Sequence, residues 1–298
     1  MWKTISQMLA EQFGAYYVIK HKQPIHNTPY QQSWLIDDGM QPVLVKSAPR
    51  HYRSKFRAEA DQFALLTKTQ SLCVPRVYGI GCAEQQSFIL LEAFCPFAPL
   101  KPHQLSDESL KHFGQQLAKL HQWQPQQQYG LDFDTWFGKV YQPNEWKSNW
   151  ATFFSEQRIG WQLQLCQEQG IYFGDIDKIT QAIAHQLAKH NPAPALLQGA
   201  LWQQNCFVLS QVNIAEQKQT ILCYSPACYW GDRECDLALT ELQGFPHAFY
   251  QGYQQSYPLD SGYLQRKPIY QLYYLLHLIQ HQQKEYLEQA QQIIDLFR

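Results

Sequence analysis

The 298-residue sequence is poor in charged side chains and has no long basic segment. Charged residues make up 16% of the chain, against a typical ~25%, and the formal net charge at pH 7 is −1. A non-specific nucleic-acid binder needs a basic face for the phosphates, so we expect no nucleic-acid partner. Glutamine replaces much of the usual surface charge, which we interpret as a means of keeping the protein soluble.

Long apolar runs are also missing. No run reaches the ~18 residues that are needed to span a bilayer. The first residues, Met1–Ser6, are not followed by the apolar core of a secretory signal peptide. We therefore expect a cytoplasmic protein with no membrane partner.

The eight cysteines are scattered and form no C-x-x-C pair. This spacing argues against a zinc ribbon or a thioredoxin-type motif, and we expect free thiols of a reducing compartment. The sequence also contains no G-x-S-x-G motif, so an unrelated hydrolase has no support.

Apolar residues are nevertheless plentiful, at 45% of the chain, and their spacing differs between two parts of the sequence. The first part predicts helices at 1–13 and 54–68 and strands at 16–20, 32–36, 42–46, 77–82 and 87–92, with a turn at Asp37–Gly39. After a linker at 95–100, the second part predicts helices at 107–123, 144–170, 175–190 and 268–297, and a hairpin at about 205–224. We predict an α+β, two-lobed fold like that of protein kinases, with a β-rich lobe at 1–94 and a mainly helical lobe at 95–298.

Two motifs suggest nucleotide chemistry. Val43-Leu44-Val45-Lys46 ends a predicted strand and matches V-A-I-K, whose lysine contacts the α- and β-phosphates and pairs with a glutamate of the next helix. Glu59 lies on the next predicted helix. The second motif is the segment Leu197–Asn205. Kinase catalytic loops carry an aspartate, four residues and an asparagine, and here Asn205 stands five places after Ala200.

Further segments match in order along the whole chain, and with them the sequence resembles the fructosamine kinase (ketosamine kinase) family, bacterial branch, within the aminoglycoside/choline kinase-like fold. The segments that carry this resemblance are Tyr141–Asn144, Trp150–Arg158, Gly231–Ala238, Phe245-Pro246, Pro258-Leu259 and Arg266–Tyr273.

The resemblance implies an ATP- and Mg²⁺-dependent kinase that phosphorylates ketosamines on glycated amines or proteins. Lys46 and Glu59 would hold the phosphates, and Asn205 would ligate Mg²⁺. Asp232 and Glu234 would support the catalytic loop or the substrate pocket. The backbone at Glu92 and Phe94 resembles a kinase hinge, which binds adenine.

The departures from the family pattern fall on these chemical positions. The family's His-Gly-Asp is Gln198-Gly199-Ala200, so the catalytic base is missing at Ala200. The family's Phe-Asp-Pro-Ala is Tyr224-Ser225-Pro226-Ala227, and the hydroxyl of Ser225 is a poor substitute for a carboxylate on Mg²⁺. The phosphate-covering glycines correspond to Asn27 and Thr28, and a later Gly-Gly pair corresponds to His281–Gln283.

We therefore predict a catalytically impaired pseudokinase. Its expected partner is a ketosamine-like ligand, a nucleotide without metal or a protein. The alternative is an active small-molecule kinase with a rearranged site, in which Asp232, Glu234 or Asp236 supplies a carboxylate. We expect His121, which ends a predicted helix, to be a structural, hydrogen-bonded histidine.

Overall fold

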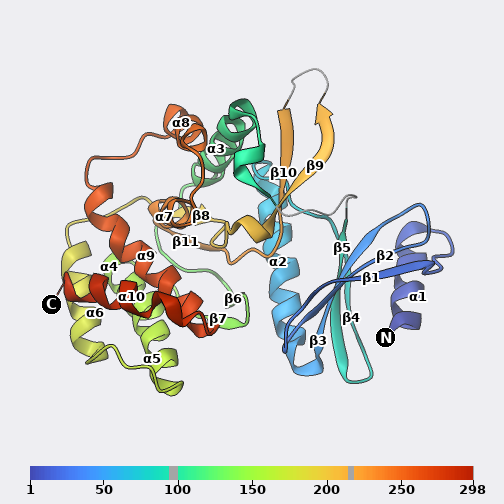
Figure 1. Ribbon diagram of the computed structural model, residues 1–298, viewed down its shortest axis with the longest axis horizontal. Helices are drawn as coiled ribbons and strands as arrows, with labels where there is room; N and C mark the ends of the chain where they lie inside the picture. The colour runs from blue at the N-terminus through green and yellow to red at the C-terminus, as the bar shows by residue number, and fades with distance from the viewer. Residues whose placement is uncertain (94–99, 214–217, 298) are drawn as a thin grey trace. The chain divides into compact units, whose positions relative to one another are not determined.

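The computed structural model describes residues 1–93, 100–213 and 218–297 (Figure 1). The chain forms two compact units. The first consists of Met1–Lys101 together with Gln204–Pro226, and the second of Pro102–Gln203 together with Ala227–Arg298. The boundary expected at residues 94–95 and most of the predicted linker lie outside the described residues.

The first unit contains a five-stranded antiparallel sheet with the strand order β1-β2-β3-β5-β4. The strands are β1 (His21–Asn27), β2 (Gln32–Asp37), β3 (Val43–Pro49), β4 (Val77–Ala83) and β5 (Gln86–Glu92). The predicted turn between β2 and β3 is confirmed, because the Asp37 carboxylate accepts the amide of Gly39, whose φ of +92° is favourable for glycine.

One helix packs on each face of this sheet, as Figure 1 shows for α1 (Trp2–Phe13) and α2 (Arg53–Thr69). Ile5 and Leu9 of α1 pack in a cluster with Val45. Phe56 and Phe63 of α2 pack in a separate cluster with the neighbouring Leu44. Successive residues of a strand point to opposite faces, so β3 carries apolar side chains to both helices.

The strand predicted at 16–20 is wrong, because the first strand begins at His21. Tyr17 is instead buried before the strand and its hydroxyl donates to the carbonyl of Gln41. The sequence of β1 contains Pro24, which cannot donate to a ladder and reads as a strand breaker. It is tolerated here because β1 is an edge strand.

A hairpin from late in the sequence completes the first unit. It consists of β9 (Cys206–Asn213) and β10 (Lys218–Cys223), and it confirms the hairpin predicted at about 205–224. Phe207, Leu222 and Tyr224 belong to the same cluster as Phe56 and Phe63. The hairpin therefore supplies part of the core between α2 and the sheet.

The second unit is mainly helical. Its helices are α3 (Asp107–His121), α4 (Trp150–Phe154), α5 (Trp161–Glu168), α6 (Ile176–Leu187), α7 (Glu234–Leu242), α8 (His247–Ser256), α9 (Tyr263–Gln280) and α10 (Leu287–Asp295). Its short strand pairs are β6 (Thr135–Phe137) with β7 (Val140–Gln142) and β8 (Ala195–Leu197) with β11 (Tyr229–Gly231). The α+β class predicted for the chain is confirmed.

Two of the predicted long helices are wrong in extent. The helix expected at 144–170 begins only at Trp150, because the Asn149 side chain accepts the amide of Thr152 and caps it. It also includes a π-helical turn at Ser155–Gly160. The helix expected at 268–297 begins earlier, at Tyr263, and is interrupted after Gln280, where Gln282 has a φ of +65°.

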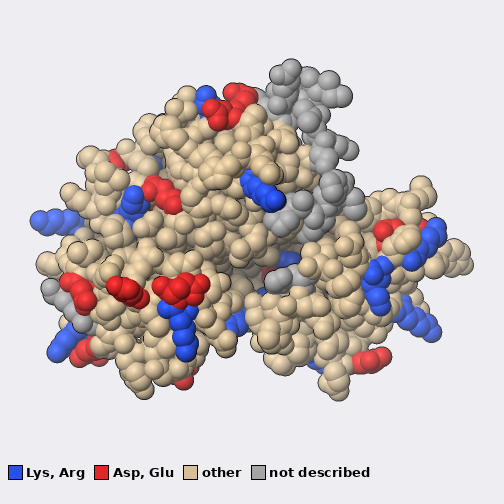
Figure 2. All heavy atoms as spheres, in the orientation of Figure 1, with Lys and Arg blue, Asp and Glu red and all other residues tan. Residues whose placement is uncertain are grey.

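On the molecular face drawn in Figure 2, uncharged residues cover most of the surface, and the charged side chains form small scattered groups. This agrees with the low charged fraction and the net charge of −1. Among the described residues, no helix combines the length and the apolar character that a bilayer crossing requires.

Candidate functional site

In the first unit, the lysine and the glutamate singled out from the sequence form a buried ion pair. Lys46 lies on β3 and Glu59 on the second turn of α2, and each is 5% exposed. Lys46 Nζ lies 2.5 Å from Glu59 Oε1. A buried ammonium group needs a partner of opposite charge, and Glu59 supplies it.

The same lysine also contacts Ser225, which the sequence resemblance places at the position of a metal-binding aspartate. Lys46 Nζ donates to Ser225 Oγ at 2.7 Å. Ser225 has a φ of +53°, a left-handed conformation that Asp and Asn tolerate better than Ser. The backbone at this position therefore still suits an aspartate, whereas the side chain offers only a neutral hydroxyl.

Asn205 is held next to this segment through its backbone. It ends the short 3₁₀ turn Gln203–Asn205, and its carbonyl accepts the amide of Tyr224 at 2.7 Å. The two expected metal-site positions, 205 and 225, are therefore brought together at the base of the β9–β10 hairpin. Of the two side chains, an amide and a hydroxyl, neither carries a negative charge.

Asn27 and Thr28, which we expected at the positions of phosphate-covering glycines, lie at the end of β1 and in the turn that leads to β2. Asn27 ends β1, and Thr28 closes the turn: its amide donates to the Gln31 carbonyl at 2.8 Å, and its hydroxyl accepts the Gln31 amide at 3.0 Å. Gln31 in turn reaches α2, where its Oε1 accepts a hydrogen bond from Lys55 Nζ at 2.8 Å. The turn is thus tied to α2 next to Glu59.

At the expected hinge, the backbone of Glu92 is already engaged. Its amide donates to the carbonyl of Arg76 at 2.8 Å, and its carbonyl accepts the hydroxyl of Tyr224 at 2.9 Å. Phe94 lies outside the described residues. Glu92 therefore has a structural role in linking β5 to the hairpin segment.

In the second unit, the loop around Ala200 is held by hydrogen bonds from a carboxylate outside it. Asp236, on the first turn of α7, accepts the amides of Gln198 and Gly199, each at 2.8 Å. Gly199 has a φ of +77°, and a Cβ placed there would lie 2.1 Å from the Ala227 carbonyl oxygen, so the position requires glycine. The loop keeps a defined shape although Ala200 has no carboxylate.

The residue before this glycine fills part of the loop with its own side chain. Gln198 is fully buried, and its Oε1 accepts the amide of Ala200 at 2.7 Å. Its Nε2 has no hydrogen-bond partner among the described residues. The Gln198 side chain therefore stabilises the loop through a hydrogen bond to a backbone amide of the same loop.

The expectation for His121 is confirmed. Its Nδ1 lies 2.8 Å from the Tyr253 hydroxyl and its Nε2 lies 3.2 Å from Asp236 Oδ2. The imidazole is buried. It supports the carboxylate that holds the loop and is a structural histidine.

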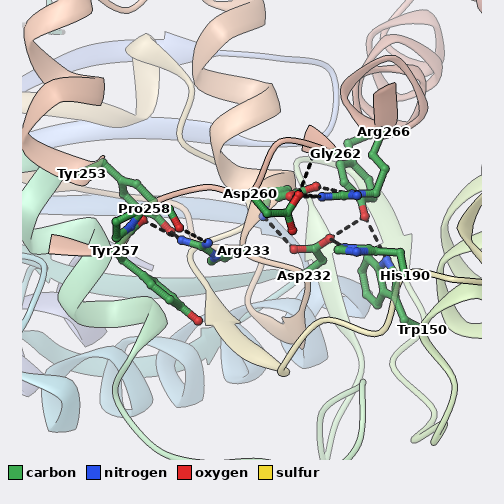
Figure 3. Close-up of polar contacts among 12 residues, drawn as sticks. Trp150, His190, Asp232, Arg233, Tyr253, Tyr257, Pro258, Asp260, Gly262 and Arg266 are labelled. Atoms are coloured by element: carbon green, nitrogen blue, oxygen red, sulfur yellow. Dashed lines mark hydrogen bonds and ion pairs between the residues drawn. The ribbon is translucent and has the colours of Figure 1, made fainter. Parts of the chain in front are cut away.

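Asp232 and Glu234 lie in a network that Figure 3 shows in part. Asp232 Oδ2 lies 2.6 Å from His190 Nε2 and accepts the hydroxyl of Tyr270 at 2.5 Å. Glu234 receives two hydrogen bonds from Arg266, at 2.6 and 2.8 Å. Burial raises the pKa of the Glu234 carboxyl, and the bonds from Arg266 oppose that shift. Both carboxylates are almost fully buried.

His190, Asp232 and Glu234 place potential metal-ligand atoms within 4.8 Å of one another. Two contacts argue against a metal ion bound by these three residues. Arg266 already neutralises the Glu234 carboxylate, and the Tyr270 hydroxyl already donates a hydrogen bond to Asp232 Oδ2. The two carboxylates of the cluster are therefore paired with protein side chains. The cluster holds the segment before α9 through Arg266, which also bonds Asp260 at 2.7 Å.

Sequence reasoning missed Lys55, Gln31, His190 and Arg266. The position of Lys55, one helical turn before Glu59, was the only available signal for it. The other three contribute through contacts with residues that are distant in the sequence, which no local pattern reveals.

Known proteins match this chain over almost its whole length. The family model described as "Fructosamine kinase" matches residues 1–297. A "Probable ketoamine kinase" of Pasteurella multocida is 54% identical over 295 residues, covering 99% of this chain and 98% of its own. One from Escherichia coli is 41% identical over 296 residues, again covering 99% and 98%.

Solved structures agree with this assignment. The crystal structure of a "Putative fructosamine-3-kinase" from Haemophilus somnus is 51% identical, covers 100% of this chain and 97% of its own, and has a TM-score of 0.90. An ADP-bound aminoglycoside phosphotransferase is only 14% identical, covers 99% and 98%, and has a TM-score of 0.62. The latter likeness concerns the fold alone.

Proposed function

The chain belongs to the fructosamine kinase family, and from this premise we propose that it is a pseudokinase that retains the frame of a ketoamine kinase without its phosphoryl transfer. The frame would still receive a ketosamine-like ligand, a nucleotide or a protein partner. The observation that carries the proposal is the contact of Lys46 Nζ with Ser225 Oγ at 2.7 Å, where the family pattern has a carboxylate.

The residues present do not fit a Mg²⁺-nucleotide complex. Mg²⁺ prefers carboxylate oxygens together with phosphate oxygens, and the pair Asn205 and Ser225 offers none of the former. Loss of a positioned base at Ala200 alone removes roughly 10²–10⁴-fold of rate. The two losses need not multiply, because the effects of residues that act together are non-additive, and we expect turnover far below that of ordinary kinases.

The alternative, an active kinase with a rearranged site, needs a carboxylate that is free to act. Asp232, Glu234 and Asp236 are the candidates, and each already accepts two or more hydrogen bonds within the second unit. They are at most 2% exposed. Recruiting any of them would leave buried donors unpaired, which costs about 1–3 kcal/mol for each neutral group.

The test is phosphorylation of a simple fructosamine by the wild type and by the Ala200→Asp/Ser225→Asp double variant. We expect no measurable turnover by the wild type and a gain of activity in the double variant, because the base and the metal ligand return together. The matched control is Ala200→Asn/Ser225→Asn, which has nearly the same side-chain size and no charge. Wild-type turnover of about 1 s⁻¹ or more, the low end for kinases, would exclude the proposal.

A further inference from the structure

Lys55 is a buried cation without a buried counter-ion of its own. It lies on the first turn of α2 and is 8% exposed. Its Nζ donates to the neutral Oε1 of Gln31 at 2.8 Å and lies 5.7 Å from the centre of the Tyr30 ring. Among the described residues, no carboxylate lies within ion-pair distance of its Nζ.

The surrounding charge is unbalanced. Lys46, Lys55 and Glu59 bring two ammonium groups and one carboxylate into the buried region beside β3, and Ser225 adds no charge. The carboxylate of Glu59 lies against Lys46. Burial lowers the pKa of Lys55 to about 8, the charge of Glu59 opposes that shift, and the charge of Lys46 adds to it. A net positive charge therefore remains in a region largely shielded from water, which is unfavourable until an anion arrives.

The element that faces Lys55 is the one expected to cover phosphates. Gln31 belongs to the connection between β1 and β2, and it presents an acceptor oxygen to Lys55. A phosphoryl oxygen is also an acceptor, carries charge, and makes the stronger hydrogen bond with an ammonium group. Gln31 Oε1 thus holds the position that an anionic oxygen would take.

We propose that Lys55 and Lys46 together bind the polyphosphate group of a ligand, and that they do so without a divalent cation. The second lysine supplies the positive charge that Mg²⁺ supplies in metal-dependent kinases, and Ser225 accommodates this by carrying no charge that would repel a phosphate. The inference rests on the proposed loss of metal-dependent phosphoryl transfer. Its ligand class is a nucleoside triphosphate or a free polyphosphate.

The test is a binding titration of the full chain with ATP, inorganic tripolyphosphate and AMP, each in EDTA and in excess Mg²⁺. We expect ATP or tripolyphosphate to bind in EDTA at least as tightly as in Mg²⁺, because Mg²⁺ neutralises the charge that the lysines recognise. AMP, with one phosphate, should bind more weakly. Binding of both polyphosphates identifies the polyphosphate as sufficient, and binding of ATP alone identifies a nucleotide ligand.

Three variants separate the contribution of Lys55 from general effects on the protein. Lys55→Gln should weaken binding in EDTA at least about tenfold, since a hydrogen bond to a charged group is worth that much. Lys68→Gln, on the exposed side of the same helix, should leave it unchanged. Gln31→Glu would give Lys55 an internal counter-ion. Gln31→Glu should therefore weaken polyphosphate binding about as much as Lys55→Gln does. A thermal unfolding transition verifies that the variant is folded.

The inference is overturned if neither polyphosphate binds in EDTA, if binding requires Mg²⁺, or if Lys55→Gln binds as the wild type does. These failures are distinct from failure of the proposed function. Turnover of a fructosamine by the wild type contradicts the loss of phosphoryl transfer, whereas metal-free binding that depends on Lys55 can be observed whether or not turnover occurs.

Discussion

At the scale of single residues, Lys55 couples its ionisation to folding. Its pKa is lowered to about 8 in the folded chain from an ordinary value of 10.5, chiefly because the ammonium group is buried. Below about pH 8 both the folded and the unfolded chain hold the proton, and the folded chain bears the full cost of the buried charge. Between about pH 8 and 10.5 the folded chain has released a proton that the unfolded chain still binds, so stability rises with pH.

We expect the wild type to gain stability over Lys55→Met by up to roughly 3 kcal/mol as the pH rises through that interval. The measurement is urea unfolding of both proteins at a series of pH values. Tyrosines that titrate nearby, such as Tyr30, are present in both proteins and cancel in the difference. Lys68→Met provides the control, and a Lys55→Met difference as flat as that of the control would show that the charge of Lys55 is not buried in solution.

The residue scale also shows what a motif can and cannot predict. Lys46 and Glu59 could be found because a lysine at a strand end and a glutamate on the next helix form a local pattern. Ser225 and Ala200 were singled out because they interrupt such patterns, and the roles given to them stay predictions. Lys55 and Gln31 could not, since their contact depends on where the β1–β2 turn lies over α2, and that position depends on the tertiary fold.

At the scale of elements, the loop at 198–200 depends on a helix that follows it by more than thirty residues. The Asp236 carboxylate on α7 bonds the amides of Gln198 and Gly199, and His121 of α3 bonds the same carboxylate. Three segments of the second unit therefore meet at one buried charge. Removing that charge should loosen all three.

We expect Asp236→Asn to lower the free energy of unfolding by about 2–4 kcal/mol, because hydrogen bonds to a buried charge are lost and one amide is left unpaired. Chemical denaturation monitored by circular dichroism measures this. Asp177→Asn, an exposed position in the first turn of α6, should cost less than about 0.5 kcal/mol. Equal effects of the two substitutions would contradict the role given to Asp236.

Elements were predicted well where apolar spacing is regular and poorly where side chains set the ends. The spacing in α2 and β3 sufficed to locate both. The start of α4 was missed because it depends on the Asn149 cap, and the break after α9 was missed because His281–Tyr286 contains neither glycine nor proline to mark it. Pro24 obscured β1, since its tolerance depends on an edge position that only the sheet reveals.

At the scale of the whole molecule, a unit is not a continuous stretch of sequence. The core between α2 and the sheet contains Phe207, Leu222 and Tyr224 from the late hairpin segment. Reading along the chain predicted the hairpin itself but not the unit to which it belongs. The contact between α2 and the hairpin joins residues far apart in the sequence, so the apolar spacing within either segment does not reveal it.

We therefore expect a fragment of residues 1–101 not to fold cooperatively, because it exposes Phe56 and Phe63 where the hairpin covers them. Joining 1–101 to 204–226 through a flexible Gly/Ser linker should restore a cooperative thermal transition. Circular dichroism and the dispersion of amide NMR signals distinguish the two fragments. A cooperative transition in the shorter fragment would mean that the hairpin is not needed for this core.

The anchoring of the Ala200 loop has a consequence for substitutions at position 200. The carboxylate that fixes the loop is Asp236, and the conformation that the loop requires is supplied by Gly199, so neither function falls on position 200. We therefore expect the conformation of the loop to tolerate either aspartate or alanine at position 200. The conformation of this loop is thus separable from the side chain at position 200, which under the proposed function is where the chemistry is lost.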